Sequence, residues 1–204
     1  MSGFVKNDRP KLLLVCGTWG GGTTALAGML AALGIKSPVP LHGVTDERTM
    51  NTFESILFRE AVMSVVSEEF MKLTVSRADA LQSMIAFRDR LLEQQQREGW
   101  LDDGKPIFLK YPLSALLIPE LCQVFETRLI YVIRPLKDVE ASRRRRGWPA
   151  NAGEKGGASS THRCFIFSSI CRFRQPSSVT RNWWQTRCVT QKSWRLSAVS
   201  RTGH

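Results

Sequence analysis

The sequence predicts an α/β fold in which helices cover both faces of a parallel sheet. Three short apolar runs, at Leu12–Cys16, Ile107–Leu109 and Leu129–Ile133, are each followed by a turn and a helical pattern. Continuous apolar runs of this length are typical of strands buried in parallel sheets. Because such sheets bind ligands at the carboxyl ends of their strands, we expect functional residues directly after these runs.

A glycine-rich stretch, GTWGGGTT at residues 17–24, connects the first strand to a helix. Glycines let backbone N–H groups surround an anion closely, and the helix presents the positive end of its dipole. Gly17 and Gly22 have the spacing of the nucleotide-binding pattern G-x-x-x-x-G-K-[ST], with Thr24 in the Ser/Thr place and Thr23 in the lysine place. The stretch predicts phosphate binding and a P-loop topology resembling that of nucleoside triphosphatases. The missing lysine argues against ordinary ATP or GTP hydrolysis, and a glycine-rich turn that binds nothing is the alternative.

The remaining helices are predicted from spacing and capping signals. The apolar positions of Phe53–Phe70 indicate one helix, and Ser76 with Asp79 forms a capping box that opens another. A further helix is expected over Leu113–Val124, divided by a proline. The last one follows the third strand and ends at Gly147.

Basic residues follow the second and third strands. Lys110 ends one, and Arg134 ends the other. Ser142 lies eight residues after Arg134, about two turns into the next helix, so a guanidinium and a hydroxyl can bind one phosphate there. Together with the glycine-rich stretch these strand ends suit a polyanion, although Arg134 alone could be an ordinary surface arginine.

The charge is concentrated at the end of the chain. Eight of the 29 Lys and Arg residues, and no Asp or Glu, lie between Ala158 and His204, so most of the net charge of +11 belongs there. We divide the chain into an α/β domain at 1–150 and a basic tail rich in Ser, Thr and Arg at 151–204, with a short strand at Arg163–Ile170. The tail is interpreted as a poorly structured or out-of-frame segment; the alternative is a basic, aromatic arm for nucleic acid or an acidic membrane.

Targeting and metal signals are weak. The apolar run near the N-terminus is shorter than that of a signal peptide, and no run approaches the ~20 residues of a membrane span, so we expect a cytoplasmic protein. Five cysteines without a C-x-x-C pair indicate neither a disulfide framework nor a metal site.

Four segments carry a resemblance to the sulfotransferase family. VCGTWGGGTTALAGMLAALGI resembles its 5′-phosphosulfate-binding loop, whose common bacterial form reads approximately G-x-x-R-S-G-T-[ST]-x-L, and RLIYVIRPLKDVEASRRRRGW resembles its 3′-phosphate-binding segment. FLKYPLSALLIPEL is similar to the family's K-x-P…L…P segment, and Asn51–Ser55 is faintly similar to N-P-x-G-x-F-E. The similarity covers about residues 11–148, which implies an incomplete or frame-altered relative.

The resemblance implies transfer of a sulfuryl group from 3′-phosphoadenosine 5′-phosphosulfate to a hydroxyl or amine of a small-molecule or glycan acceptor. Nucleic acid is not expected as a partner, and no metal is expected as a cofactor. Residues carried over by the resemblance are the loop residues Gly20, Gly21, Gly22, Thr23 and Thr24 for the 5′-phosphate and sulfate, and Arg134 and Ser142 for the 3′-phosphate.

Position 20 departs from the family, which usually has Arg or Lys where this chain has Gly20. Either Lys110 substitutes for that cation or catalysis is feeble, and we expect Gly20→Arg to raise donor affinity or turnover. His42 and Glu54 are candidate general bases, with a solvated loop or helix-face position as the plainer interpretation of each. Two other functions stay open, another P-loop phosphotransferase and a non-catalytic nucleotide-binding protein.

Overall fold

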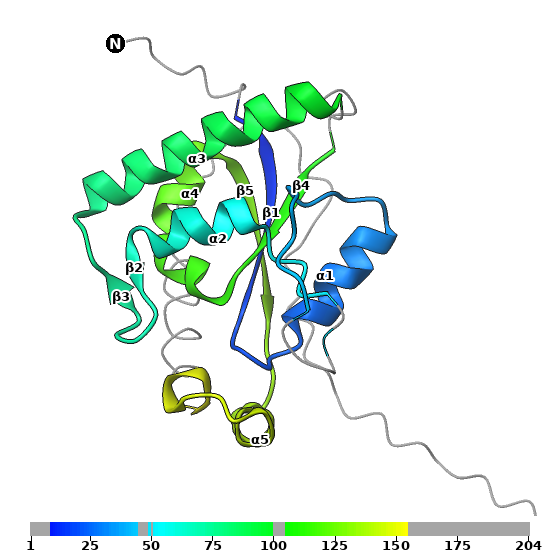
Figure 1. Cartoon of the computed structure of the whole chain (residues 1–204), viewed down its shortest axis with the longest axis vertical. Coiled ribbons are helices and arrows are strands. Elements are labelled where there is room, and N and C mark those ends of the chain that lie inside the picture. The colour runs from blue at the N-terminus through cyan, green and yellow to red at the C-terminus, as the bar shows by residue number, and fades with distance from the viewer. Residues whose placement is uncertain (1–8, 45–48, 50, 100–104, 155–204) are drawn as a thin grey trace, which may run out of the picture. The chain divides into compact units, whose positions relative to one another are not determined.

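The computed structural model describes residues 9–44, 49, 51–99 and 105–154. Three strands, β1 (Lys11–Gly17), β4 (Ile107–Lys110) and β5 (Glu126–Val132), form a parallel sheet in the order β4-β1-β5. The α/β class and the parallel sheet are therefore confirmed (Figure 1). The third strand lies slightly earlier than predicted, because its pairing with β1 begins at Glu126 and ends at Val132.

Helices cover both faces of this sheet. Side chains of β1 alternate between two apolar clusters, so Leu14 packs toward one face and Val15 toward the other. Helix α1 (Thr23–Ala32) covers the face with Val15, whereas α3 (Arg77–Glu98) and α4 (Ile118–Val124) cover the opposite face (Figure 1). The central strand β1 is consequently buried on both sides, as its apolar run predicts.

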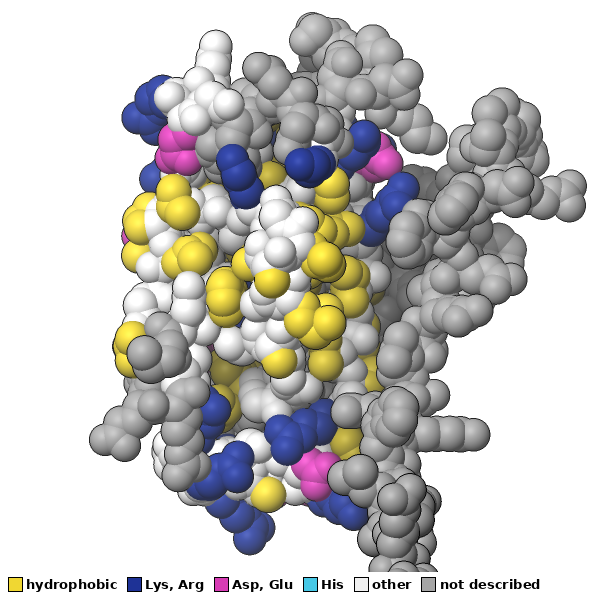
Figure 2. Space-filling model, turned by 90° about the vertical axis from the view of Figure 1, so that its right-hand side faces the viewer, with side chains coloured by type: hydrophobic (Ala, Val, Ile, Leu, Met, Phe, Trp, Pro, Cys, Tyr) yellow, Lys and Arg dark blue, Asp and Glu magenta, His cyan; other side chains and the backbone are white. Residues whose placement is uncertain are grey.

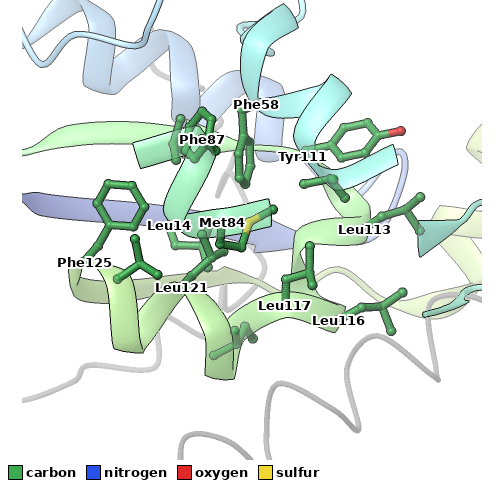
Figure 3. Packing of buried hydrophobic residues seen from close by; sticks show 14 of the residues in the cluster. Leu14, Phe58, Met84, Phe87, Tyr111, Leu113, Leu116, Leu117, Leu121 and Phe125 are labelled. Carbon is green, nitrogen blue, oxygen red and sulfur yellow. The ribbon is translucent and has the colours of Figure 1, made fainter. Parts of the chain in front are cut away.

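Aromatic rings form the centre of the larger cluster. The ring of Phe87 on α3 lies 5.2 Å from that of Phe58 on α2 (Ile56–Met63) and 6.0 Å from that of Phe125, measured between centroids. Figure 3 shows Phe58 and Phe87 side by side near Met84. These tilted arrangements bring ring edges toward ring faces, and the contacts join α2, α3 and the start of β5.

One helix prediction is wrong at its first three residues and in its second half. The helix expected over Phe53–Phe70 is only α2, and a two-stranded antiparallel hairpin follows it, β2 (Val66–Ser67) with β3 (Lys72–Leu73). The neighbours Val65 and Val66 are both buried at 2% exposure, and β-branched residues favour extended backbone. Burial of consecutive side chains suits a turn and hairpin better than a helix with one apolar stripe.

The cap predicted at Ser76 and the stop predicted at Gly147 are confirmed, whereas the helix expected over Leu113–Val124 is α-helical only in its second half. The Ser76 hydroxyl accepts a hydrogen bond from the Asp79 N–H at 3.1 Å and caps α3. The helix expected over Leu113–Val124 is divided into a 3₁₀ turn, η1 (Pro112–Leu117), and α4. Helix α5 (Leu136–Arg146) ends at Gly147, whose φ of +66° closes the helix in the left-handed region.

The chain beyond α5 is described only as far as Glu154. A short 3₁₀ turn, η2 (Ala150–Ala152), follows α5, and the Asn151 side chain donates to the backbone oxygen of Glu68 at 2.9 Å. The strand expected at Arg163–Ile170 lies outside the described residues, as does the rest of the tail. Within the described part, no helix combines the length and the apolar character needed to cross a membrane.

Replacing Phe87 with Ala is expected to lower the free energy of unfolding by about 3–5 kcal/mol, because it leaves a cavity between two aromatic rings. Urea unfolding followed by tryptophan fluorescence measures this loss. The matched control is Phe70→Ala: Phe70 is 62% exposed, so its loss should cost under about 1 kcal/mol. Equal losses in the two variants would contradict the assignment of Phe87 to the core.

Candidate functional site

The glycine-rich stretch forms a tight turn between β1 and α1. The Gly21 N–H donates to the backbone oxygen of Thr18 at 2.9 Å, and a Cβ at Gly21 would lie 2.8 Å from that backbone oxygen. Gly20 and Gly22 have φ angles of +69° and +99°. No side chain caps α1 at Gly22, so the first N–H groups of this helix are aimed at the turn. This arrangement suits an anion at the start of α1.

The two threonines that follow Gly22 have different environments. Thr23 is buried at 6% exposure, and a Cβ at Gly17 would lie 2.7 Å from its methyl group, so this side chain packs down on the strand end. The Thr24 hydroxyl instead accepts a hydrogen bond from the Lys110 ammonium at 3.2 Å.

Lys110, at the end of β4, lies in a buried ionic cluster beside α1. Its Nζ donates to Glu54 Oε1 at 2.7 Å and to the backbone oxygen of Thr52 at 3.1 Å, besides Thr24. The side chains of Lys110 and Glu54 are only 5% and 14% exposed. All three protons of the ammonium therefore have acceptors, and the structure brings together three residues predicted from separate segments.

Arg134 approaches the other side of the turn from the end of β5. Its Nη1 donates to the Gly20 oxygen at 2.7 Å and to the Ser142 hydroxyl at 3.2 Å. Ser142 is 3% exposed on α5, which positions its hydroxyl firmly. Arg134 makes no ion pair with any residue in the described ranges. The predicted pair of Arg134 and Ser142 is thus adjacent in space and in contact with the glycine turn.

His42 lies on the segment that pairs with Glu54. The backbone N–H of His42 donates to the backbone oxygen of Glu54 at 2.7 Å, and the backbone oxygen of His42 accepts from the Thr52 hydroxyl at 2.9 Å. The Nδ1 atom of the ring is enclosed and has no hydrogen-bond partner within the part of the chain that the structure describes. The two candidate bases therefore belong to paired segments.

Tyr111 follows Lys110 but is unsuited to act as a base. Burial, and then the negative charge of Glu68, raise its pKa to about 12, so the phenol keeps its proton at neutral pH. Its hydroxyl lies 3.2 Å from the sulfur of Met63. Figure 3 shows this hydroxyl pointing away from the apolar cluster.

Sequence reasoning missed two contributors to the site. One is the backbone oxygen of Thr52, which no side-chain pattern reveals. The other is Trp148, whose ring would lie 3.6 Å from a Cβ at Gly20 and which stacks under the Arg146 guanidinium at 4.8 Å. The sequence does carry a signal for Trp148, because the residue directly after a helix-ending glycine commonly folds back onto the last turn of the helix. Here the backbone N–H of Trp148 donates to the backbone oxygen of Arg143 at 3.1 Å.

Part of the arginine run on α5 is neutralised within the helix. The Glu140 carboxylate accepts from Arg143 at 2.7 Å and from Arg144 at 3.0 Å, and these hydrogen bonds lower the pKa of Glu140 to about 2. Lys and Arg side chains still gather at the lower end of Figure 2, the end where α5 and the carboxyl ends of the strands lie in Figure 1. The electrostatic environment of the turn is therefore basic.

The described residues contain no group of three or more His, Cys, Asp and Glu side chains that could hold a metal ion. Comparison of the chain with models of protein families, with curated proteins and with solved structures gave no match.

The geometry adds a stability cost to Gly20→Arg that the sequence did not predict. Any L-residue at a φ of +69° costs about 1–2 kcal/mol, and its Cβ would lie 3.1 Å from that of Ser142. We expect Gly20→Arg to lower the free energy of unfolding, as measured by urea unfolding. Gly34→Arg is the matched control, because Gly34 has a φ of +78° with nothing within 4 Å. A smaller stability loss at position 20 than at position 34 would contradict the crowding by Ser142.

The Glu140 network predicts a specific dependence on pH. The folded pKa of about 2 lies below the ordinary value of 4.5, so the stabilisation is complete above about pH 4.5 and is lost as the pH falls toward 2. Melting temperatures of wild type and Glu140→Gln should therefore differ at pH 7 and converge near pH 2. Glu126→Gln, at an exposed carboxylate of β5, is the control and should lower the melting temperature less at pH 7.

Proposed function

We propose that this chain is a sulfotransferase-like protein that binds 3′-phosphoadenosine 5′-phosphosulfate along the carboxyl edge of its sheet. The observation that carries the proposal is that Arg134 Nη1 donates both to the Ser142 hydroxyl, at 3.2 Å, and to the backbone oxygen of Gly20, at 2.7 Å. A guanidinium beside a hydroxyl suits a terminal phosphate dianion. The uncapped N-terminus of α1 lies at the same turn, so a ligand with two separated anionic groups fits better than one with a single anion.

The topology supports the same proposal. The central strand β1 leads directly into the glycine turn and α1, with parallel strands on each side. This arrangement is compatible with a P-loop topology, in which phosphate groups lie over the turn at the start of the helix. We propose in addition that the protein acts in the cytoplasm and that the sulfuryl group is accepted by a small molecule or a glycan.

The reaction transfers a sulfuryl group without a redox step. The acceptor oxygen or nitrogen forms a bond to sulfur, the bond between sulfur and the bridging phosphate oxygen breaks, and the acceptor proton passes to a base. Glu54 and His42 are the candidate bases. The N–H groups of Gly22, Thr23 and Thr24 would stabilise charge that develops on the leaving phosphate. Lys110, whose three protons already have acceptors, would act through the Thr24 hydroxyl that it holds.

An ATP-dependent phosphotransferase is less well supported. Such enzymes have a lysine in the place that Thr23 occupies in this chain, and its ammonium reaches the β- and γ-phosphates. Thr23 is buried against Gly17 and has no ammonium group to offer a nucleotide. The 3′-phosphate site at Arg134 and Ser142 also has no role in binding ATP, which lacks a 3′-phosphate.

Adenosine 3′,5′-bisphosphate is expected to raise the melting temperature of the protein more than ATP does at equal concentration. Arg134→Ala should weaken binding of the bisphosphate about ten- to hundredfold, because a charge-assisted hydrogen bond is worth ~1.5–3 kcal/mol. Differential scanning fluorimetry and calorimetry measure these two effects. Arg128→Ala is the matched control, since Arg128 is exposed on the same strand near its opposite end.

An equal or larger thermal shift with ATP would overturn the assignment of the donor. Equal weakening by Arg134→Ala and Arg128→Ala would show that general positive charge, rather than the Arg134–Ser142 pair, attracts the nucleotide. Transfer of labelled sulfate from the donor to a panel of hydroxyl and amine acceptors then tests the catalytic part of the proposal.

A further inference from the structure

The backbone turns sharply at Phe53, immediately before Glu54. Phe53 has a φ of +56°, and outside glycine such a left-handed conformation is uncommon and costs roughly 1–2 kcal/mol. Backbone strain of this kind persists only where the surrounding structure fixes it, and it is concentrated at functional sites.

Three contacts hold the strained residue. The Phe53 N–H donates to Asn51 Oδ1 at 2.7 Å, a local turn in which the Asn side chain replaces a backbone acceptor. The Glu54 N–H donates to the Thr52 hydroxyl at 3.3 Å. The ring of Phe53 belongs to the smaller apolar cluster and packs on α1 at Gly28, where a Cβ would lie 3.3 Å from the ring.

The turn has a consequence for Lys110. The backbone oxygen of Thr52 and the carboxylate of Glu54, on either side of Phe53, both accept from the same ammonium, at 3.1 Å and 2.7 Å. In an extended strand, carbonyl groups lie in the plane of the sheet and side chains stand perpendicular to it, so these two acceptors would diverge. The left-handed residue makes them converge while its own ring points into the apolar cluster beside α1.

We propose that Phe53 is a positioning residue, held by Asn51 and Gly28, that fixes the Glu54–Lys110 pair against Thr24 at the first turn of α1. Its ring attaches the 51–54 segment to the same helix whose N-terminus borders the proposed nucleotide site. Lys110 is thereby fixed at a defined place beside the turn, where a small displacement would shift the Thr24 hydroxyl that it holds at the first turn of α1. The catalytic part of this inference rests on the proposed function, but the geometric part does not.

The geometric part is tested by acetylation of lysines in the folded, full-length chain with acetic anhydride, followed by peptide mass spectrometry. Asn51→Ala removes the acceptor of the Phe53 N–H, whereas Asn51→Asp keeps an oxygen there. We expect Lys110 to react about five- to tenfold faster in Asn51→Ala, relative to the exposed Lys72, and at the wild-type rate in Asn51→Asp. Phe53→Ala, which removes the ring contact with Gly28, should also raise the relative rate.

An unchanged relative rate at Lys110 in both Asn51→Ala and Phe53→Ala would overturn the proposal. So would equal acceleration by Asn51→Ala and Asn51→Asp, because the acceptor oxygen would then be irrelevant. A parallel rise at Lys72 and Lys110 indicates general loosening of the fold and also counts against a positioning role.

The catalytic part is tested by steady-state kinetics of sulfuryl transfer. Asn51→Ala should lower kcat about tenfold, a change of 1.4 kcal/mol in the barrier, with the KM for the donor unchanged, and Asn51→Asp should restore kcat. A raised KM with unchanged kcat would contradict the positioning role. If the wild-type chain transfers no sulfuryl group to any acceptor, the proposed function fails, while the acetylation result still decides the geometry around Lys110.

Discussion

The arrangement of the site depends on the hydrogen bonds and the ion pair that the buried ammonium of Lys110 makes. Its three hydrogen bonds join the end of β4, the segment at Thr52–Glu54 and the first turn of α1. Removing one member of such a buried pair leaves an uncompensated charge, which typically costs about 3–5 kcal/mol. The cluster therefore couples the stability of this edge of the sheet to the placement of a cation beside the glycine turn.

The two cationic groups beside the turn differ in how they are held. Lys110 is buried and paired with Glu54, whereas Arg134 is exposed and bonded to the neutral oxygens of Gly20 and Ser142. A buried, fully paired lysine is pre-organised for one position. An exposed guanidinium bound only to neutral groups can exchange one of them for a phosphate oxygen at lower cost. The proposed 3′-phosphate site is thus the more adaptable half, and the Lys110 side the more rigid.

Most of the fold follows from local signals in the sequence. The apolar runs of β1 and β4, the Ser76 cap and the stop at Gly147 each depend on a residue type whose conformational preference agrees with the surrounding structure. The run Leu129–Ile133, predicted as a buried strand, is only partly buried, with Ile133 43% exposed, because within the described residues no further strand pairs with the outer side of β5. The prediction over Phe53–Phe70 failed in its second half because burial of Val65 and Val66 depends on the hairpin packing against the larger cluster. Periodicity alone does not distinguish a helix from a helix followed by a hairpin in such a short stretch.

The sequence by itself determined the α/β class, the glycine turn and the order of basic residues at the strand ends. It did so because apolar periodicity, glycine conformational freedom and capping chemistry are local properties. Only the tertiary structure decided that Lys110 pairs with Glu54 and Thr52, that Trp148 lies against Gly20, and that a side chain at position 20 would be crowded by Ser142 at a strained φ. Those contacts join residues far apart in the chain, so their geometry depends on how β4, α1 and α5 meet at one edge of the sheet.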